Sequence, residues 1–139
     1  MSNHHATCVA IGSKGILIRG ASGSGKSTLA LQLLESGAKL VSDDQTILEV
    51  VKGKLMASPP KALAGLVEIR GLGLIKRKFK PSVAIKLVVD LRPPAEIIRM
   101  PEASDLRVEI LNLKIPRVAI AIGHPAAPTI LRSALRELA

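Results

Sequence analysis

The sequence predicts one α/β domain, residues 1–139, with a mixed β-sheet and few helices. Three observations support this prediction. A glycine-rich phosphate-binding loop lies between a strand-like run and a helical run. Most other apolar runs are short and rich in β-branched residues. Only two segments show a helical pattern, so the regular strand–helix alternation of a doubly wound sheet is absent.

The first part of the chain predicts a strand at 7–11, a glycine-containing turn, and a second strand at 16–19. The phosphate-binding loop follows, and 28–35 is predicted as a helix. Gly37 lies where a helix often ends in a left-handed residue. A short buried strand is then expected at 39–42.

The middle of the chain predicts a hairpin formed by 46–51 and 55–57. Residues 66–70 are expected to be extended. The aliphatic, β-branched run at 83–90 is typical of a central strand.

The last part predicts an irregular, proline-interrupted stretch at 92–104 and strands at 107–113 and 118–122. A helix is expected to begin near Pro128. Its predicted apolar face consists of Ile130, Leu131, Ala134, Leu135 and Leu138.

The phosphate-binding loop has the pattern G-x-x-x-x-G-K-[ST]. Its residues are Gly20, Ala21, Ser22, Gly23, Ser24, Gly25, Lys26 and Ser27. The glycines let main-chain N–H groups turn toward an anion, and the helix N-terminus adds unpaired donors. Lys26 can reach the β and γ phosphates and Ser27 can bind Mg²⁺, and we include Thr28 in the predicted nucleotide site.

Asp43 and Asp44 close the short strand at 39–42. At the carboxyl edge of such a sheet, one carboxylate can support Mg²⁺ and the other can accept a proton from an attacking hydroxyl. Adjacent strand residues face opposite ways, so we expect the two roles to be divided. The alternative interpretation is a solvated turn.

Other polar residues give weaker signals. Glu68 and Arg70 would share one face of an extended segment, and a surface ion pair is the simpler interpretation. His4 and His5 are also consistent with a disordered tail or half a metal site. His124 is more typical of a loop residue than of a catalyst.

Composition limits the range of partners. The net charge is +9, which can attract nucleic acid, a phosphorylated ligand or an acidic partner. The densest basic cluster, 76–80, is consistent with a solvated loop, a docking surface for an acidic protein, or nucleic-acid binding. One Phe and no Tyr or Trp leave little for base stacking, so we expect no nucleic-acid partner. A lone cysteine and no long apolar run predict a cytoplasmic protein without a membrane partner.

Several segments together resemble the catalytic domain of HPr kinase/phosphorylase. They are the run from Asn3 through His5 to Thr7, the phosphate-binding loop, the run from Leu40 to Asp44, and Glu-Ile-Arg-Gly-Leu-Gly from Glu68. The last run is the most specific, because the loop alone occurs in many families. The resemblance implies a fold similar to the nucleotide domain of phosphoenolpyruvate carboxykinase. It also implies ATP-dependent phosphorylation of a serine in the carrier protein HPr, and the reverse reaction with phosphate that releases pyrophosphate.

The resemblance also implies residue roles. Asp43 would be the base in the kinase direction and the acid in reverse, with His5 as its neighbour and Lys26 on the β-phosphate. Metal and phosphate support would come from Ser27, Asp44 and Glu68, and Arg70 would organise the phosphate site. The family also implies a homo-oligomer, a hexamer.

Two alternatives remain open from the sequence. A small-molecule kinase would carry the same loop, but it normally needs an arginine-bearing lid, and only the stretch at 92–101 is a candidate. A non-catalytic nucleotide-binding module would bind ATP without turnover. The acidic pair beside an intact loop favours an enzyme.

Overall fold

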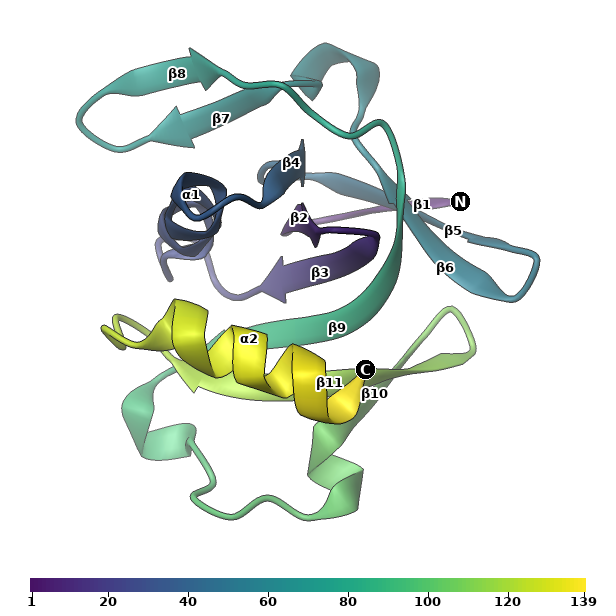
Figure 1. Cartoon of the computed structure of the whole chain (residues 1–139), viewed down its shortest axis with the longest axis vertical. Coiled ribbons are helices and arrows are strands. Elements are labelled where there is room, and N and C mark those ends of the chain that lie inside the picture. Colours follow the sequence, from purple (N-terminus) through teal and green to yellow (C-terminus); the bar gives the residue numbers. More distant parts are fainter.

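Nine strands form one curled, mixed sheet, and two further strands form a separate hairpin (Figure 1). The computed structural model describes residues 1–139. The sheet strands are β1 (Ser2–His4), β2 (Ala6–Ile11), β3 (Lys14–Arg19), β4 (Lys39–Ser42), β5 (Thr46–Val51), β6 (Lys54–Ser58), β9 (Val83–Arg92), β10 (Arg107–Ile110) and β11 (Leu113–Ala121). The hairpin consists of β7 (Leu66–Ile69) and β8 (Gly73–Lys76). The helices are α1 (Lys26–Glu35) and α2 (Ala127–Leu138), so the predicted α/β class is confirmed.

Four strands of the sheet run in the same direction. β3 and β11 both pair in parallel with β9. β2 is antiparallel to both β3 and β4, so β4 runs in the direction of β3. The carboxyl ends of these strands therefore meet at one edge, and this edge positions the candidate site.

β9 is the central strand, as its aliphatic sequence predicts. Its first half pairs with β6 and its second half with β11, while β3 runs along its other side. Alternate residues of β9 enter two different cores: Leu87 and Val89 face the helices, and Val88 faces the opposite side. This burial on both faces explains why the strand reads as a nearly continuous apolar run.

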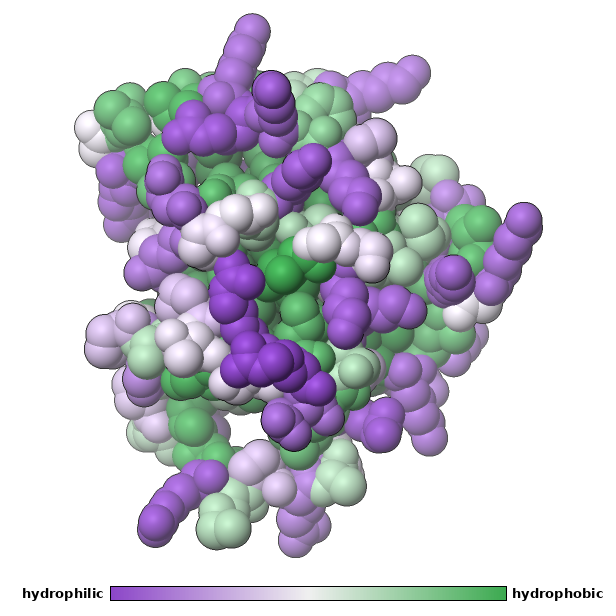
Figure 2. All heavy atoms as spheres, viewed as in Figure 1, coloured by the Kyte–Doolittle hydropathy of each residue, from purple (hydrophilic) through white to green (hydrophobic).

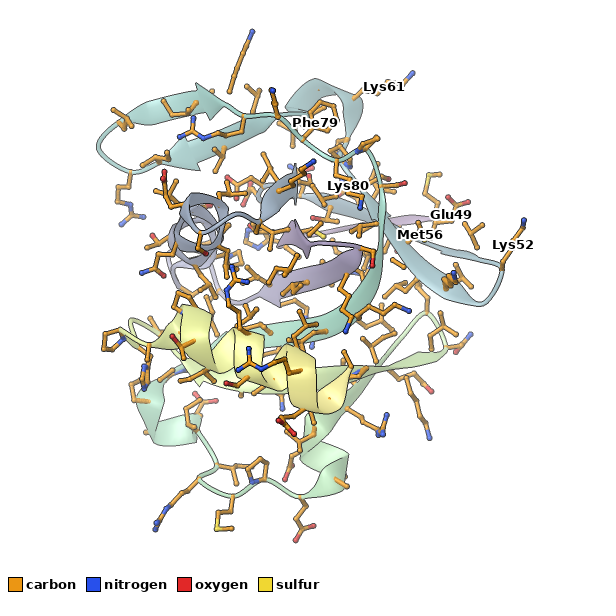
Figure 3. All side chains as sticks on the ribbon, viewed as in Figure 1. Glu49, Lys52, Met56, Lys61, Phe79 and Lys80 are labelled. Atoms are coloured by element: carbon orange, nitrogen blue, oxygen red, sulfur yellow. The ribbon has the colours of Figure 1, made fainter.

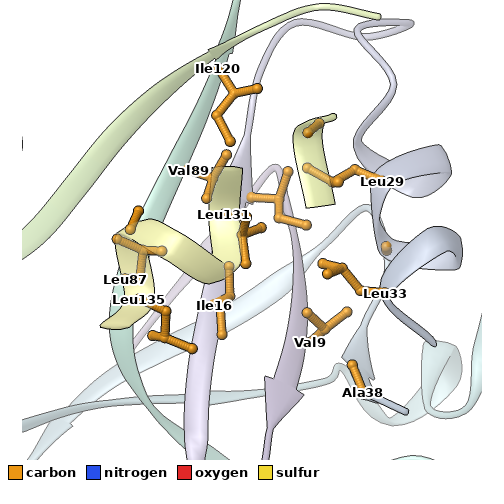
Figure 4. Close-up of a cluster of buried hydrophobic side chains, with 14 of the residues drawn as sticks. Val9, Ile16, Leu29, Leu33, Ala38, Leu87, Val89, Ile120, Leu131 and Leu135 are labelled. Atoms are coloured by element: carbon orange, nitrogen blue, oxygen red, sulfur yellow. The ribbon is translucent and has the colours of Figure 1, made fainter. Parts of the chain in front are cut away.

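The two helices cover one face of the sheet and share a core with it (Figure 4). Leu29 and Leu33 of α1 and Leu131 and Leu135 of α2 pack against this face. The predicted apolar face of α2 is thus confirmed, since Leu131 is fully buried. A second core fills the opposite face of the sheet, beneath strands that include β5, β6, β10 and β11.

Three parts of the chain differ from the prediction. The expected strand at 107–113 ends at Ile110, because Leu111 and Asn112 both adopt positive φ angles and turn the chain. The following strand therefore starts at Leu113 and not at residue 118. At the N-terminus, β1 pairs with β5 and is not a disordered tail. The expected irregular stretch at 92–104 contains two short 3-10 helices, η2 (Pro94–Glu96) and η3 (Ala103–Leu106).

Candidate functional site

The phosphate-binding loop connects β3 to α1 at the carboxyl edge of the sheet. Gly25 precedes the first turn of α1 with a φ of 96°, a conformation that favours glycine. Gly20 packs closely: a Cβ atom there would lie 2.4 Å from Ser24 Oγ and 3.2 Å from Leu91 Cβ. A side chain at Gly20 would therefore clash with its neighbours, and the backbone conformation of Gly25 favours glycine.

Two polar side chains of the loop are buried. Lys26 Nζ donates hydrogen bonds to the carbonyl oxygens of Gly20, at 2.9 Å, and Ala21, at 3.1 Å. Ser24 Oγ has no hydrogen-bond partner within the protein. A buried hydroxyl without a partner is costly, so a phosphate oxygen or water is a fitting partner for it. The loop therefore fits a polyphosphate.

Asp43 lies directly against the loop. Its Oδ1 accepts hydrogen bonds from the hydroxyls of Ser27, at 2.7 Å, and Thr7, at 2.9 Å. Its Oδ2 accepts one from the backbone N–H of Glu68, at 3.1 Å. The residue is only 5% exposed. As expected, this carboxylate lies at the carboxyl edge of the sheet, next to the loop.

Asp44 turns away from Asp43, with a φ of 68°. Its Oδ1 lies 2.9 Å from Nε2 of His5, and both side chains are about half exposed, at 63% and 48%. The sequence interpretation placed His5 beside Asp43, and the structure corrects this: His5 contacts Asp44. The predicted division of the two carboxylates between two directions is present, because Asp43 faces the loop and Asp44 faces the rim.

Glu68 and Arg70 reach the same cleft from β7 and the turn after it. The cleft has a volume of about 470 Å³ and is lined by the loop, His5, Asp44, Glu68 and Arg70. In Figure 1 the β7–β8 hairpin lies over α1, and α1 and β7 are in contact. Most predicted site residues thus line one cleft. Asp43 does not line it but contacts Ser27 and Glu68, which do. Three loop residues, Gly20, Ala21 and Ser24, also lie outside the lining.

The cleft fits Mg²⁺ only in part. No group of three or more His, Cys, Asp or Glu side chains is arranged to hold a metal ion. Ser27, Asp44 and Glu68 offer oxygen ligands around the cleft. Mg²⁺ commonly takes one or two protein oxygens together with phosphates and water, and the available groups suit that mode.

Three residues of the site were missed by the sequence interpretation. Thr7 is fully buried, donates to Asp43, and accepts a hydrogen bond from the N–H of Asp44 at 3.1 Å. The available signal was one hydroxyl in the otherwise apolar strand β2. Leu31, a half-buried residue of α1, and Ile69 of β7 also line the cleft, and nothing in the pattern of either segment singled them out.

A partly buried ion-pair network lies on the same edge of the sheet. Asp90 of β9 accepts hydrogen bonds from Arg19 of β3, at 2.7 and 2.9 Å, and from Arg117 of β11, at 2.7 Å. Burial opposes ionisation of this carboxyl, but the hydrogen bonds and charges of the two arginines outweigh it. The pKa of Asp90 is therefore lowered.

A larger cavity, of about 540 Å³, lies between β11 and the segment before it. It is lined by Arg92, Arg99, Arg117 and neighbouring apolar residues, and it shares no residue with the cleft. The smaller cleft is the candidate site because only that one is lined by residues of the phosphate-binding loop. Neither helix, of 10 and 12 residues, could cross a membrane.

Curated relatives share this sequence at moderate identity. HPr kinase/phosphorylase of Clostridium tetani is 32% identical over 130 residues, which cover 85% of this chain and 42% of the relative. The enzyme of Mycoplasmopsis pulmonis is 34% identical over 143 residues, covering 94% and 46%. That of Clostridium beijerinckii is 44% identical over 71 residues, covering 51% and 24%. The chain therefore spans less than half the length of these relatives.

A solved structure has the same fold. The HPr(Ser) kinase/phosphatase of Coxiella burnetii superposes with a TM-score of 0.84 at 26% identity, covering 98% of this chain and 89% of that one. The family described as HPr Serine kinase C-terminal domain matches residues 1–136. With the phosphate-binding loop and the acidic strand end in one cleft, this match shows that the chain belongs to the HPr serine kinase C-terminal domain family.

Proposed function

We propose that this chain transfers the γ-phosphoryl group of ATP to a serine hydroxyl of an HPr-type phosphocarrier protein. The observation that carries the proposal is the contact between Asp43 and Ser27. It joins a buried carboxylate to the hydroxyl of a phosphate-binding loop at 2.7 Å. The family membership and the names of the relatives support the choice of acceptor.

The loop would bind the nucleotide through its phosphates. Main-chain N–H groups of the loop and the start of α1 point toward an anion, and Lys26 would add a charge-assisted hydrogen bond. Ser24 Oγ, buried without a partner, is a further donor. The adenine would lie against aliphatic groups such as Leu31 and Ile69, because the cleft contains no aromatic side chain.

Ser27, supported by Asp44 and Glu68 across the cleft, would hold Mg²⁺. The ion would neutralise the charge that develops on the phosphates. Asp43 Oδ1 lies next to the Ser27 oxygen, because it accepts the Ser27 hydroxyl hydrogen bond at 2.7 Å. The Asp43 carboxylate would accept the hydroxyl proton of the acceptor serine.

In the forward reaction the serine oxygen forms a bond to the γ-phosphorus, and the bond from that phosphorus to the β,γ-bridging oxygen breaks. ADP leaves, and the serine proton passes to Asp43. In the reverse reaction, phosphate attacks the phosphoserine phosphorus, pyrophosphate leaves, and Asp43 returns a proton to the serine oxygen. Arg70 would position the transferred group from the rim.

A comparison of Asp43→Asn and Asp44→Asn tests these roles. We expect Asp43→Asn to lower kcat for acceptor phosphorylation by about 10²–10⁴-fold while ATP still binds. Asp44→Asn should chiefly raise the Mg²⁺ concentration that gives half-maximal activity. His5→Gln should resemble Asp44→Asn, since His5 contacts Asp44. Phosphoserine would be located by mass spectrometry, and nucleotide affinity measured by calorimetry.

The outcomes separate the competing assignments. Asp43→Asn could keep full activity while Asp44→Asn and His5→Gln lose it. That result would indicate that Asp44, and not Asp43, is the general base. Transfer to a metabolite but not to HPr-type proteins would indicate a small-molecule kinase. Tight ATP binding without turnover on any acceptor would indicate a regulatory module. The cytoplasmic location, the hexamer and the lack of nucleic-acid or membrane partners stay predictions of the sequence.

A further inference from the structure

A strip of basic side chains begins at the last residue of β8 and carries four positive charges. This basic strip consists of Lys76, Arg77, Lys78 and Lys80. None of the four forms an ion pair, because the salt bridges of the protein involve His5, Arg19, Arg92 and Arg117. Figure 2 shows hydrophilic side chains projecting from the end of the molecule that holds β7 and β8. The strip therefore presents uncompensated charge to solvent.

The strip has a fixed position in the fold. The backbone N–H of Lys80 donates to the carbonyl of Leu40 in β4, at 2.7 Å, and Phe79 forms an isolated parallel bridge with Leu40. The backbone N–H of Arg77 donates a hydrogen bond to the carbonyl oxygen of Gly65, at 2.7 Å. Figure 3 shows Phe79 and Lys80 where the chain passes from β8 toward β9. A strip held in this way can present its charges in a constant arrangement.

The same hairpin connects the strip to the catalytic cleft. β7 carries Glu68, whose N–H contacts Asp43, and Arg70 lines the cleft just after it. β8 pairs with β7 residue by residue, from Leu66–Lys76 to Ile69–Gly73. A protein that places a serine in the cleft would therefore lie next to this hairpin.

Exposed apolar side chains of the same hairpin and of the basic run favour a protein partner over a small anion. Leu72 in the hairpin turn and Leu74 in β8 are 68% and 69% exposed, and Phe79 is 40% exposed. Exposed apolar residues with cations around them are typical of a protein-binding surface. A single aromatic side chain gives little for stacking nucleotide bases.

We propose that the basic strip, together with Leu72 and Leu74, docks an acidic surface of the acceptor protein that lies beside its phosphorylated serine. The inference rests on the proposed function, because it names how that acceptor is recognised. The charges would steer the acceptor toward the cleft and raise its local concentration, and the leucines would supply short-range contact. The strip does not take part in phosphoryl transfer itself.

Two charge-reversal variants form a matched test. Lys76→Glu with Lys78→Glu reverses two exposed charges in the strip. Lys52→Glu with Lys54→Glu reverses two equally spaced, exposed lysines in the β5–β6 hairpin. We expect the strip variant to raise the KM for the HPr-type acceptor about tenfold, with kcat and ATP affinity unchanged. The control should stay within about twofold, and added salt should remove the difference between the two variants.

Direct binding of the acceptor, measured by calorimetry without nucleotide, separates this inference from the proposed function. Weaker acceptor binding by the strip variant alone supports docking, even if the parent chain makes no phosphoserine. Equal acceptor affinity for parent, strip variant and control overturns the inference, even if all three phosphorylate the acceptor. A loss of kcat at unchanged KM, or a loss confined to oligonucleotide binding, also overturns it. Leu72→Ser with Leu74→Ser should weaken acceptor binding by a salt-independent amount.

Discussion

At the scale of single residues, Asp90 joins three strands through two guanidinium groups. Its side chain is 12% exposed, so removing the carboxylate would leave two partly buried cations without their counter-ion. Because its pKa is lowered in the folded protein, the stability it contributes is present above its ordinary pKa of 3.8 and is lost as the pH falls through the lower folded value.

We therefore expect Asp90→Asn to lower the free energy of unfolding at neutral pH by about 3 kcal/mol. The difference from the parent should shrink as the pH falls below about 4, measured by urea denaturation across that range. Glu35→Gln, an exposed change at the end of α1, is the control. A constant difference at all pH values would contradict the ionic explanation.

At the scale of elements, the β10–β11 hairpin shows what sequence patterns miss. Leu111 and Asn112 have φ angles of 48° and 68°, the left-handed region used by two-residue hairpin turns. Asparagine tolerates this region but leucine does not, so the turn carries no recognisable signal at Leu111. The β5–β6 turn was predictable because it contains Gly53, which adopts the positive φ that its neighbour Lys52 also has.

Leu111→Asn should raise the free energy of unfolding by about 0.5 kcal/mol, since it relieves the strain of leucine in a left-handed conformation. Thermal unfolding followed by circular dichroism measures the effect. Ile110→Asn, one residue earlier, is the control and should destabilise the protein, because Ile110 is only 7% exposed. Destabilisation by both changes would mean that the side chain of Leu111 contributes more by packing than its backbone costs.

At the scale of the whole molecule, the two helices and the sheet share one core. Leu131 is fully buried and belongs to the same cluster as Leu33, Val89 and Ile120. Leu131→Ala should lower the free energy of unfolding by about 3 kcal/mol, measured by urea denaturation. Ile130→Ala, at a partly exposed position of the same helix, should cost less. Equal effects at the two positions would contradict this picture of the core.

Much of the fold and cleft could be predicted because each depends on a local pattern. Three such patterns are the glycine loop, the aliphatic run of β9 and the apolar face of α2. Each shows in a short stretch of sequence whether the backbone turns there or which side chains are buried. The contact of His5 with Asp44 could not be read in the same way, because it depends on the left-handed backbone of Asp44 and on the pairing of distant strands. Thr7 was missed for the same reason: its partners lie 36 and 37 residues away.

The position of Lys26 has a consequence for any measurement of ligand affinity. Its ammonium group already holds two carbonyl oxygens of the loop, so an incoming polyphosphate must compete with the protein's own backbone for one cation. The measured affinity for a polyphosphate is therefore a difference. It is the free energy of the contacts between Lys26 and the phosphate, less that of the contacts between Lys26 and the two carbonyls. A variant without this ammonium group would also leave both carbonyls without their donor, and its weakened binding would overstate what the lysine gives to the ligand.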